Sequence, residues 1–449
     1  MSRQMNLLVI VVLIGIISCN QPNTKYRHNK ITGYPDVTVT IDEQAVTGRL
    51  KKMLHQGLYF KFDAHYSSCR RHLPEKYQIY FDIVRYDLFG YPELLEVQDH
   101  LLLKKYYASL TEPEKVIYHL TKISHYQKKY DYKNALAEVL KLETFSENID
   151  TFLRADIQQW HASYFTLQHT TPMTVKKYSN NFIQLEKARG HLYIPVTING
   201  NMVNMVFDTG AGKSLISKSL AESFGLKIYE TKTEITGATG ARAATNLGIA
   251  DKILIGNTIY EHAVFEVIED SLLGVPAYNF FFDGLVGLNL LYPLGSLTMN
   301  AQGTLKIGEC SQDQIRNNLA VHLFSNRVPI IFQDDTIPVK FDTGTYMSIF
   351  NRHFYESFKS TLLANGKQET TEYGGIGGLK SIYNMIHIDS LSFGVYNDTV
   401  ILNNTWIHSK YIHKDTVSYY GQVGLDFVDH FHEISMHFTP NSIYYRNRN

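Results

Sequence analysis

The stretch that decides the fold is MVFDTGA at residues 205–211, and a second copy, VKFDTGT, stands at residues 339–345. Each copy is an apolar, strand-like run that ends in Asp-Thr-Gly, so that Asp208 and Asp342 follow directly after a strand. Asp, Thr and Gly are common wherever a strand passes into a turn, and one such tripeptide alone would carry little information. The surroundings of the two copies therefore have to be compared.

These surroundings repeat as well. A Ser follows six residues after each Asp, as Ser214 and Ser348, and a Gly-rich turn comes next, at residues 237–240 and again at 374–378. Each half then carries a Gly-x-x-Gly-Leu run, beginning at Gly284 and at Gly421. Because four features keep their order and their approximate spacing, we interpret residues 185–320 and 321–449 as two copies of one lobe.

Each lobe resembles a subunit of the retropepsin-like (clan AA) aspartic proteases, in which an apolar run ending in Asp-Thr-Gly precedes a Gly-rich flap and an apolar-Gly-apolar motif. The fused pair is similar to the two-lobed pepsin-like arrangement, and the resemblance covers roughly residues 192–445. It implies an all-β, double-lobed acid-protease-like barrel. It also implies an aspartic-type endopeptidase that acts on a peptide or protein substrate and needs no cofactor and no metal.

The resemblance assigns Asp208 and Asp342 as a catalytic pair. Two adjacent carboxylates cannot both ionise, so they share one proton, and the pair can activate a water molecule. The resemblance also gives supporting roles to residues that brace the two loops, allow tight turns or tie each loop to its lobe. These residues are Thr209, Gly210, Ser214, Thr343, Gly344 and Ser348.

The Gly-rich turns would be the tips of flaps that cover the cleft. The flap candidates are Gly237, Gly240, Tyr373 and Gly374. Tyr373 is the only aromatic residue beside either turn, which leaves open which flap closes over a substrate. Hairpins would deliver the two aspartates, with strands at 192–198 and 203–207 around Asn199-Gly200, and at 328–332 and 337–341 in the second lobe.

The residue after each Asp-Thr-Gly differs, since it is Ala211 in the first lobe and Thr345 in the second. A hydroxyl at this position can hydrogen-bond an ionised carboxylate and lower its pKa, whereas Ala cannot. We therefore expect a pair that works at milder pH than stomach-type enzymes. The alternative function is a non-catalytic or latent peptide-binding or sensing protein that uses the same cleft; intact aspartates in both lobes favour the enzyme.

Composition narrows the remaining possibilities. The chain has 449 residues, enough for two or three domains, and its 43 basic and 43 acidic residues cancel, so nothing points to a nucleic-acid partner. Its three Cys form neither a disulfide framework nor a zinc pattern, and we expect Cys69 and Cys310 to be free and buried. The spacing of His430, His432, Glu433 and His437 does not match a metalloprotease motif.

The N-terminus has the features of a targeting segment. Residues 7–17 are apolar apart from Gly15 and are followed by Ser18-Cys19, which resembles a bacterial lipoprotein signal. The resemblance implies a signal peptide at 1–19, lipidation of Cys19 and a polar tether at 20–40. Asn20 then suggests a membrane-anchored lipoprotein of the outer membrane facing the periplasm, with surface exposure left open. An ordinary signal peptide or short anchor with an incidental Cys is the alternative.

Residues 41–180 contain few Gly or Pro and are predicted to be helical. Thr111 is a candidate N-cap before Pro113, and residues 130–136 resemble the turn between paired helices in tetratricopeptide arrays. We expect stacked helical hairpins. They could serve as a docking surface for a protein partner, a spacer above the membrane or a pro-segment covering the cleft, or they could simply pack against the neighbouring lobe.

Overall fold

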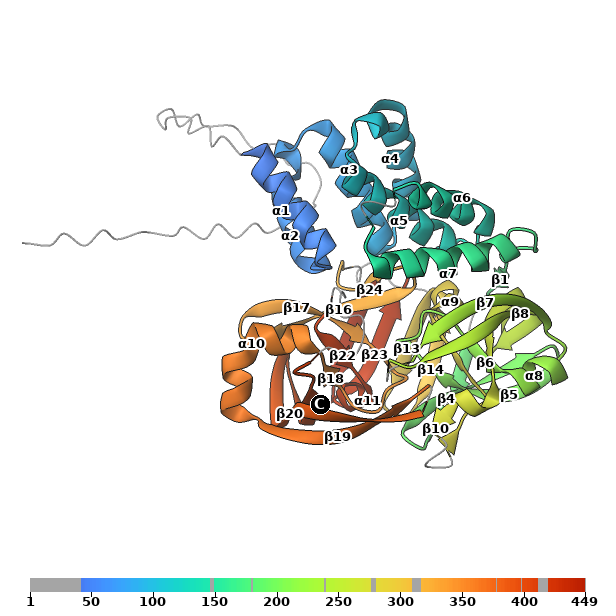
Figure 1. The fold of residues 1–449 in the computed structure, drawn as a ribbon. Helices are drawn as coiled ribbons and strands as arrows, with labels where there is room; N and C mark the ends of the chain where they lie inside the picture. The colour runs from blue at the N-terminus through green and yellow to red at the C-terminus, as the bar shows by residue number, and fades with distance from the viewer. Residues whose placement is uncertain are drawn as a thin grey trace, which may run out of the picture. The chain divides into compact units, whose positions relative to one another are not determined.

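A helical region comes first in the chain and a strand-rich region follows it, as the sequence predicts (Figure 1). The computed structural model describes residues 42–145, 149–178, 181–237, 240–275, 280–308, 316–376, 378–396, 398–410 and 419–448. A helical region followed by a large β-rich region of several sheets confirms the predicted fold class. The expected signal peptide, tether and Cys19 lie outside the described residues, as does Cys310.

The helical region consists of consecutive antiparallel helices joined by short loops. These are α1 (Glu43–His55), α2 (Tyr59–Cys69), α3 (Glu75–Phe89), α4 (Pro92–Lys105), α5 (Glu112–Lys128), α6 (Tyr132–Glu143) and α7 (Thr151–Leu167). Helix α5 begins where predicted, because Thr111 and Glu114 cap each other's backbone N–H groups and Pro113 lies in the first turn. Cys69, at the end of α2, is buried and not in a disulfide. None of the helices in the described ranges is long and apolar enough to cross a membrane.

Lobe one is built around the predicted hairpin of β4 (His191–Ile198) and β5 (Asn201–Phe207), whose end presents Asp208. It continues with β6 (Leu215–Ser217), α8 (Lys218–Ser223), β7 (Lys227–Thr236), β8 (Arg242–Ile255), β9 (Thr258–Ile268), β10 (Gly274–Val275), β11 (Phe280–Phe281), β12 (Gly284–Val286) and α9 (Leu288–Leu291). Strand β12 runs parallel to β5 and antiparallel to β6, which places the Gly-x-x-Gly run beside the Asp208 loop.

Lobe two repeats this order after the short strand β15 (Ala320–His322). Its elements are β16 (Ser325–Phe332), β17 (Asp335–Phe341), β18 (Ile349–Phe350), α10 (Arg352–Asn365), β19 (Lys367–Gly375), β20 (Gly378–Val395), β21 (Asp398–Ile407), β22 (Gly421–Val423) and α11 (Leu425–Val428). Strand β22 is parallel to β17 and antiparallel to β18, as β12 is to β5 and β6. The sequence repeat is therefore also a repeat of topology.

A shared sheet joins the lobes, in the order β2 (Asn181–Gln184), β14 (Thr304–Gly308), β13 (Ser296–Asn300), β23 (Phe431–His437) and β24 (Ser442–Asn447). Strand β13 of lobe one pairs antiparallel with β23 of lobe two. Two further short strands, β1 (Thr174–Lys176) and β3 (Glu186–Ala188), extend the lobe-one sheet through β9 and β4.

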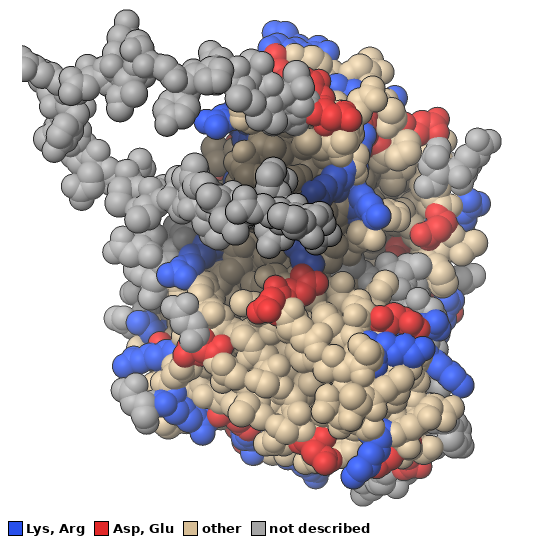
Figure 2. Space-filling view, turned by 90° about the vertical axis from the view of Figure 1, so that its left-hand side faces the viewer, with Lys and Arg blue, Asp and Glu red and all other residues tan. Residues whose placement is uncertain are grey.

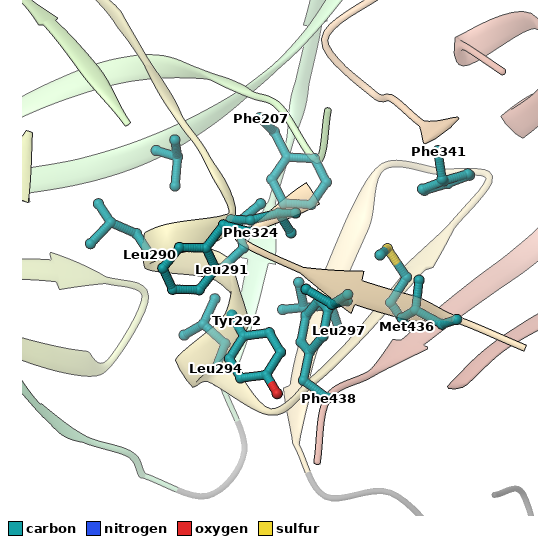
Figure 3. Close-up of a cluster of buried hydrophobic side chains, with 14 of the residues drawn as sticks. Phe207, Leu290, Leu291, Tyr292, Leu294, Leu297, Phe324, Phe341, Met436 and Phe438 are labelled. Atoms are coloured by element: carbon teal, nitrogen blue, oxygen red, sulfur yellow. The ribbon is translucent and has the colours of Figure 1, made fainter. Parts of the chain in front are cut away.

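Apolar side chains of both lobes meet at this junction (Figure 3). The ring of Tyr292 in lobe one lies against Phe438 in lobe two, with centroids 4.9 Å apart, and Phe324 packs on the same tyrosine. The cluster also contains Phe207 and Phe341, the residues immediately before the two aspartates. The loops that carry the aspartates are thus anchored in one continuous apolar core.

The helical region packs directly on the lobes, and residues 42–449 form one compact unit. Lys128 of α5 donates to the Asp87 carboxylate at 2.9 Å and to the Val321 carbonyl at 2.6 Å, and Asp87 also pairs with His322. Although burial alone raises the pKa of Asp87, Lys128 and His322 hold it below its ordinary value. Of the roles considered for the helices, these contacts correspond to packing against the lobes. Basic and acidic side chains are interspersed on the face drawn in Figure 2.

Candidate active site

Asp208 and Asp342 face each other at the ends of β5 and β17. The backbone N–H groups of Gly210 and Ala211 donate to Asp208 Oδ1 at 2.9 Å each, and Gly344 N–H donates to Asp342 Oδ1 at 3.0 Å. A Cβ atom on Gly210 would lie 2.1 Å from Asp342 Cγ, and one on Gly344 would lie 2.3 Å from Asp208 Cγ. Each glycine therefore lies against the carboxylate of the other lobe, and any side chain there would clash with it.

The two threonines of the repeated motif brace the loops across the lobe boundary. Thr209 Oγ1 donates to the Phe341 carbonyl at 2.9 Å and accepts the N–H of Thr343 at 3.0 Å. Thr343 Oγ1 donates to the Phe207 carbonyl at 2.7 Å and accepts the N–H of Thr209 at 3.1 Å. Both threonines are fully buried, so these four bonds are shielded from water and fix one loop relative to the other.

The two serines hold each loop to the Gly-x-x-Gly run of its own lobe. The hydroxyl and N–H of Ser214 donate to Asn289 Oδ1, and the same hydroxyl accepts the N–H of Gly287. In lobe two, Ser348 makes the equivalent bonds to the carboxylate of Asp426 and accepts the N–H of Gly424. Asn289 through its amide oxygen and Asp426 through its carboxylate thus accept equivalent hydrogen bonds from the serine of their own lobe.

Burial raises the pKa values of both carboxyl groups. Burial contributes most to the raised pKa of Asp208, which reaches about 8, and the charge of Asp342 adds to it. Burial likewise raises the pKa of Asp342, although the ammonium of Lys340 and the nearby His191 oppose the shift. A hydrogen bond between the two carboxyl groups further raises the pKa of Asp208.

The hydroxyl of Thr345 does not contact the aspartates. It donates to the Met347 carbonyl in its own loop at 3.2 Å. It therefore does not make the hydrogen bond to a carboxylate that the sequence alone allowed at this position. The N–H of Ala211, one position after Gly210, is the group that reaches Asp208. At this position Asp208 therefore receives a backbone N–H, which lowers its pKa, and the Thr345 hydroxyl is directed to its own loop.

Both predicted flaps are strand hairpins, and their tips touch. The first is formed by β7 and β8 and the second by β19 and β20. A Cβ on Gly237 would lie 2.3 Å from the Ile376 carbonyl, while Gly374 lies beside Val275. Ile376 packs on an apolar cluster of lobe one that includes Val206 and Leu215. Gly240 has a positive φ of 80°, as a tight turn requires. The Tyr373 side chain lies outside what the structure describes.

Two residues near the aspartates were not found by the sequence reasoning. The amide of Asn326 donates to the carbonyls of Thr209 and Phe341 and accepts the Phe341 N–H, so it links the two loops from β16. Lys340 donates to the Gly210 carbonyl at 3.2 Å. A comparison of the two repeats could have found Lys340, because a charged residue stands there where lobe one has the apolar Val206.

Metal-ligand geometry is not found among the described residues, which contain no group of three or more His, Cys, Asp or Glu side chains that could hold an ion. His437 bonds to the Ser296 hydroxyl across the shared sheet, and His430 bonds to the Asp426 carbonyl. These two histidines therefore have structural partners.

Comparison with known protein families gives a match in lobe one. Residues 194–289, which run from β4 through the Asp208 loop and the first flap to Asn289, match a family model described as aspartyl protease. A search of curated proteins found no match. The matched segment contains the first copy of every repeated motif, and it supports an aspartyl protease family for this chain.

Proposed function

We propose that this protein is an aspartic endopeptidase that hydrolyses peptide bonds through Asp208 and Asp342. The single observation that carries the proposal is the reciprocal placement of each glycine against the opposite carboxylate, which makes the two carboxyl groups immediate neighbours in a partly buried site. The match to an aspartyl protease model supports protease activity in general.

The proposed reaction uses the shared proton of the pair. The ionised carboxylate takes a proton from a water molecule, and this water attacks the carbonyl carbon of the scissile peptide bond. The protonated carboxyl group meanwhile donates a hydrogen bond to the carbonyl oxygen, and it then supplies the proton that the leaving amine needs. Raised pKa values favour this one-proton state at mild pH. The reaction needs neither a covalent intermediate nor a metal.

The alternative is a latent or non-catalytic peptide-binding protein, and one observation favours it. The tip of the second flap packs into lobe one through Ile376, beside Val206 and Leu215, so part of the cleft is filled by the chain itself. A peptide substrate would have to displace this tip. Flap opening is therefore a requirement of the proposed enzyme and the main feature of the latent alternative.

The test is cleavage of a peptide library by protein lacking residues 1–19, from about pH 4 to about pH 8. Asp208→Asn and Asp342→Asn are assayed beside the parent, with new termini identified by mass spectrometry. Cleavage by the parent that is lost in both variants supports the proposal. Absence of cleavage by the parent at every pH favours the latent or binding alternative, and persistent cleavage by either variant refutes the pair.

We further propose that Cys19 is lipidated and anchors the protein in the outer membrane. The motif Ser18-Cys19 after the apolar run at 7–17 supports this. A Cys19→Ala variant should leave the membrane fraction when expressed in its native host, and the parent should carry the mass of an attached lipid. A parent without added mass would contradict the proposal.

A further inference from the structure

Lys340 lies on the same face of β17 as the candidate catalytic carboxylate. Side chains two positions apart in a strand point to the same side, so Lys340 and Asp342 share a face. The Lys340 ammonium donates to the carbonyl of Gly210 from the opposite loop at 3.2 Å. Its charge lowers the pKa values of both Asp208 and Asp342, which also places it near the pair. An ammonium group has three donors, and this contact uses one of them.

A second cation stands next to Lys340 on the neighbouring strand. Val328 of β16 pairs with Val339 of β17, so Arg327 and Lys340 occupy the next cross-strand position and project from the same face. Both cations lie over the ring of Tyr419, at 4.2 Å for the Arg327 guanidinium and 5.7 Å for the Lys340 ammonium. Like charges in directly opposed positions destabilise a sheet.

Arg327 is buried and incompletely hydrogen-bonded. Its Nη1 donates to the Ser325 hydroxyl at 2.8 Å and to the Asn326 carbonyl at 2.6 Å, while its Nε has no hydrogen-bond partner. Within the described ranges, neither Arg327 nor Lys340 forms an ion pair with an acidic side chain. A buried charge without a counter-ion is costly, so the buried Arg327 next to the half-buried Lys340 favours an anion bound at this place.

Lobe one has no such charge at the equivalent place. There Val206, Leu285 and Leu215 lie side by side on β5, β12 and β6, and all three are buried. The matching positions in lobe two are Lys340, Gln422 and Ile349, which are only half-buried. The two halves of the cleft therefore differ in chemistry, with an apolar surface on one side of the aspartates and a cationic, partly accessible surface on the other.

From this asymmetry, and resting on the proposed peptidase function, we propose that the lobe-two half of the cleft binds a carboxylate of the substrate beside the scissile bond, with Lys340 as the contacting residue. Arg327, opposite Lys340 on the neighbouring strand β16, adds a second positive charge. The carboxylate belongs either to an Asp or Glu side chain or to a free C-terminus, because both present the same group. The apolar half in lobe one takes an uncharged side chain.

The test compares matched peptides that differ only in this carboxylate. One pair has Glu or Gln at the residue next to the scissile bond over lobe two, and a second pair has a free or an amidated C-terminus at that place. We expect the parent to cleave the carboxylate-bearing member with a kcat/KM about tenfold higher or more, as a charge-assisted hydrogen bond gives. The pair that shows the preference identifies the source of the carboxylate.

Variants then assign the preference to Lys340. Lys340→Met should abolish the preference while the uncharged peptide is still cleaved, and Lys340→Arg should largely retain it. Lys359→Met, an exposed lysine of α10 in the same lobe, is the matched control and should keep the parent preference. Equal cleavage of the members of both pairs by the parent overturns the proposal. So does a Lys340→Met variant that shifts the pH profile but keeps the preference, since Lys340 would then only tune the aspartates.

A binding assay distinguishes a failure of the carboxylate-binding proposal from a failure of the proposed peptidase function. Fluorescent forms of the same peptides are titrated against the Asp208→Asn variant, which is expected to bind without cleaving. Tighter binding of the carboxylate-bearing peptide supports the inference even if the parent cleaves nothing, in which case the peptidase function alone fails. Equal binding of the members of both pairs overturns the inference whether or not the parent cleaves peptides.

Discussion

The hydrogen bonds of Thr343 across the lobe boundary give the sharpest stability prediction. In Thr343→Val the shape of the side chain is kept, but the hydroxyl that donates to the Phe207 carbonyl and accepts the Thr209 N–H is lost. Both backbone groups are left buried and unpaired at this contact. Each such group costs about 1–3 kcal/mol, so we expect the free energy of unfolding to fall by about 2–6 kcal/mol.

Urea unfolding followed by circular dichroism measures this loss. The matched control is Thr345→Val, because that hydroxyl donates to the Met347 carbonyl within its own loop and lies in a half-buried position. We expect the control to lose about 1 kcal/mol or less. The reasoning is refuted if the two variants lose the same free energy, since the contacts between the lobes would then add nothing. If the peptidase function holds, Thr343→Val should also lower kcat.

Three further predictions follow from contacts around the pair and the helices. Gly344→Ala should abolish cleavage while circular dichroism stays native, because its Cβ would lie 2.3 Å from Asp208 Cγ; full activity would contradict this. Asp208→Asn should raise the unfolding temperature above that of the parent at neutral pH. The raised pKa of Asp208 makes its ionisation destabilise the folded parent as the pH rises, so the gain should vanish below about pH 4. A gain that is independent of pH would contradict this. Lys128→Met should lower the free energy of unfolding by about 3–5 kcal/mol in urea titrations, because the Asp87 carboxylate stays buried and loses its lysine partner. A loss below about 1 kcal/mol would contradict a stabilising role for this ion pair.

The repeated motifs predicted much of the fold and the composition of the candidate site. Short-range signals such as Asn199-Gly200 and the apolar runs before each aspartate determine hairpins locally, and the structure has those hairpins. The two Gly-rich turns likewise lie at the tips of strand hairpins. That Asp208 and Asp342 lie together came from a family resemblance, because 134 residues separate them and no local pattern fixes that distance.

What the sequence did not predict depends on contacts between distant segments. The pairing of Asp87 with Lys128 and His322 joins two helices to the segment between the lobes, and each residue alone looks like an ordinary surface charge. Tyr419 lies over Lys340 only because β22 returns beside β17. The sequence repeat shows that lobe two has Lys340 where lobe one has Val206. Only the register of the neighbouring strands shows that Arg327 and Gln422 lie next to this lysine.

We propose that the two aspartates share one proton in a partly buried site, and the pH dependence of kcat/KM tests this most directly. Because burial raises the pKa of Asp208 to about 8, while Lys340 and His191 limit the rise at Asp342, we predict a bell-shaped profile. Its optimum should lie well above the ordinary Asp pKa of about 4. A profile governed by a single ionisation, or an optimum below about pH 3, would contradict the shared-proton account.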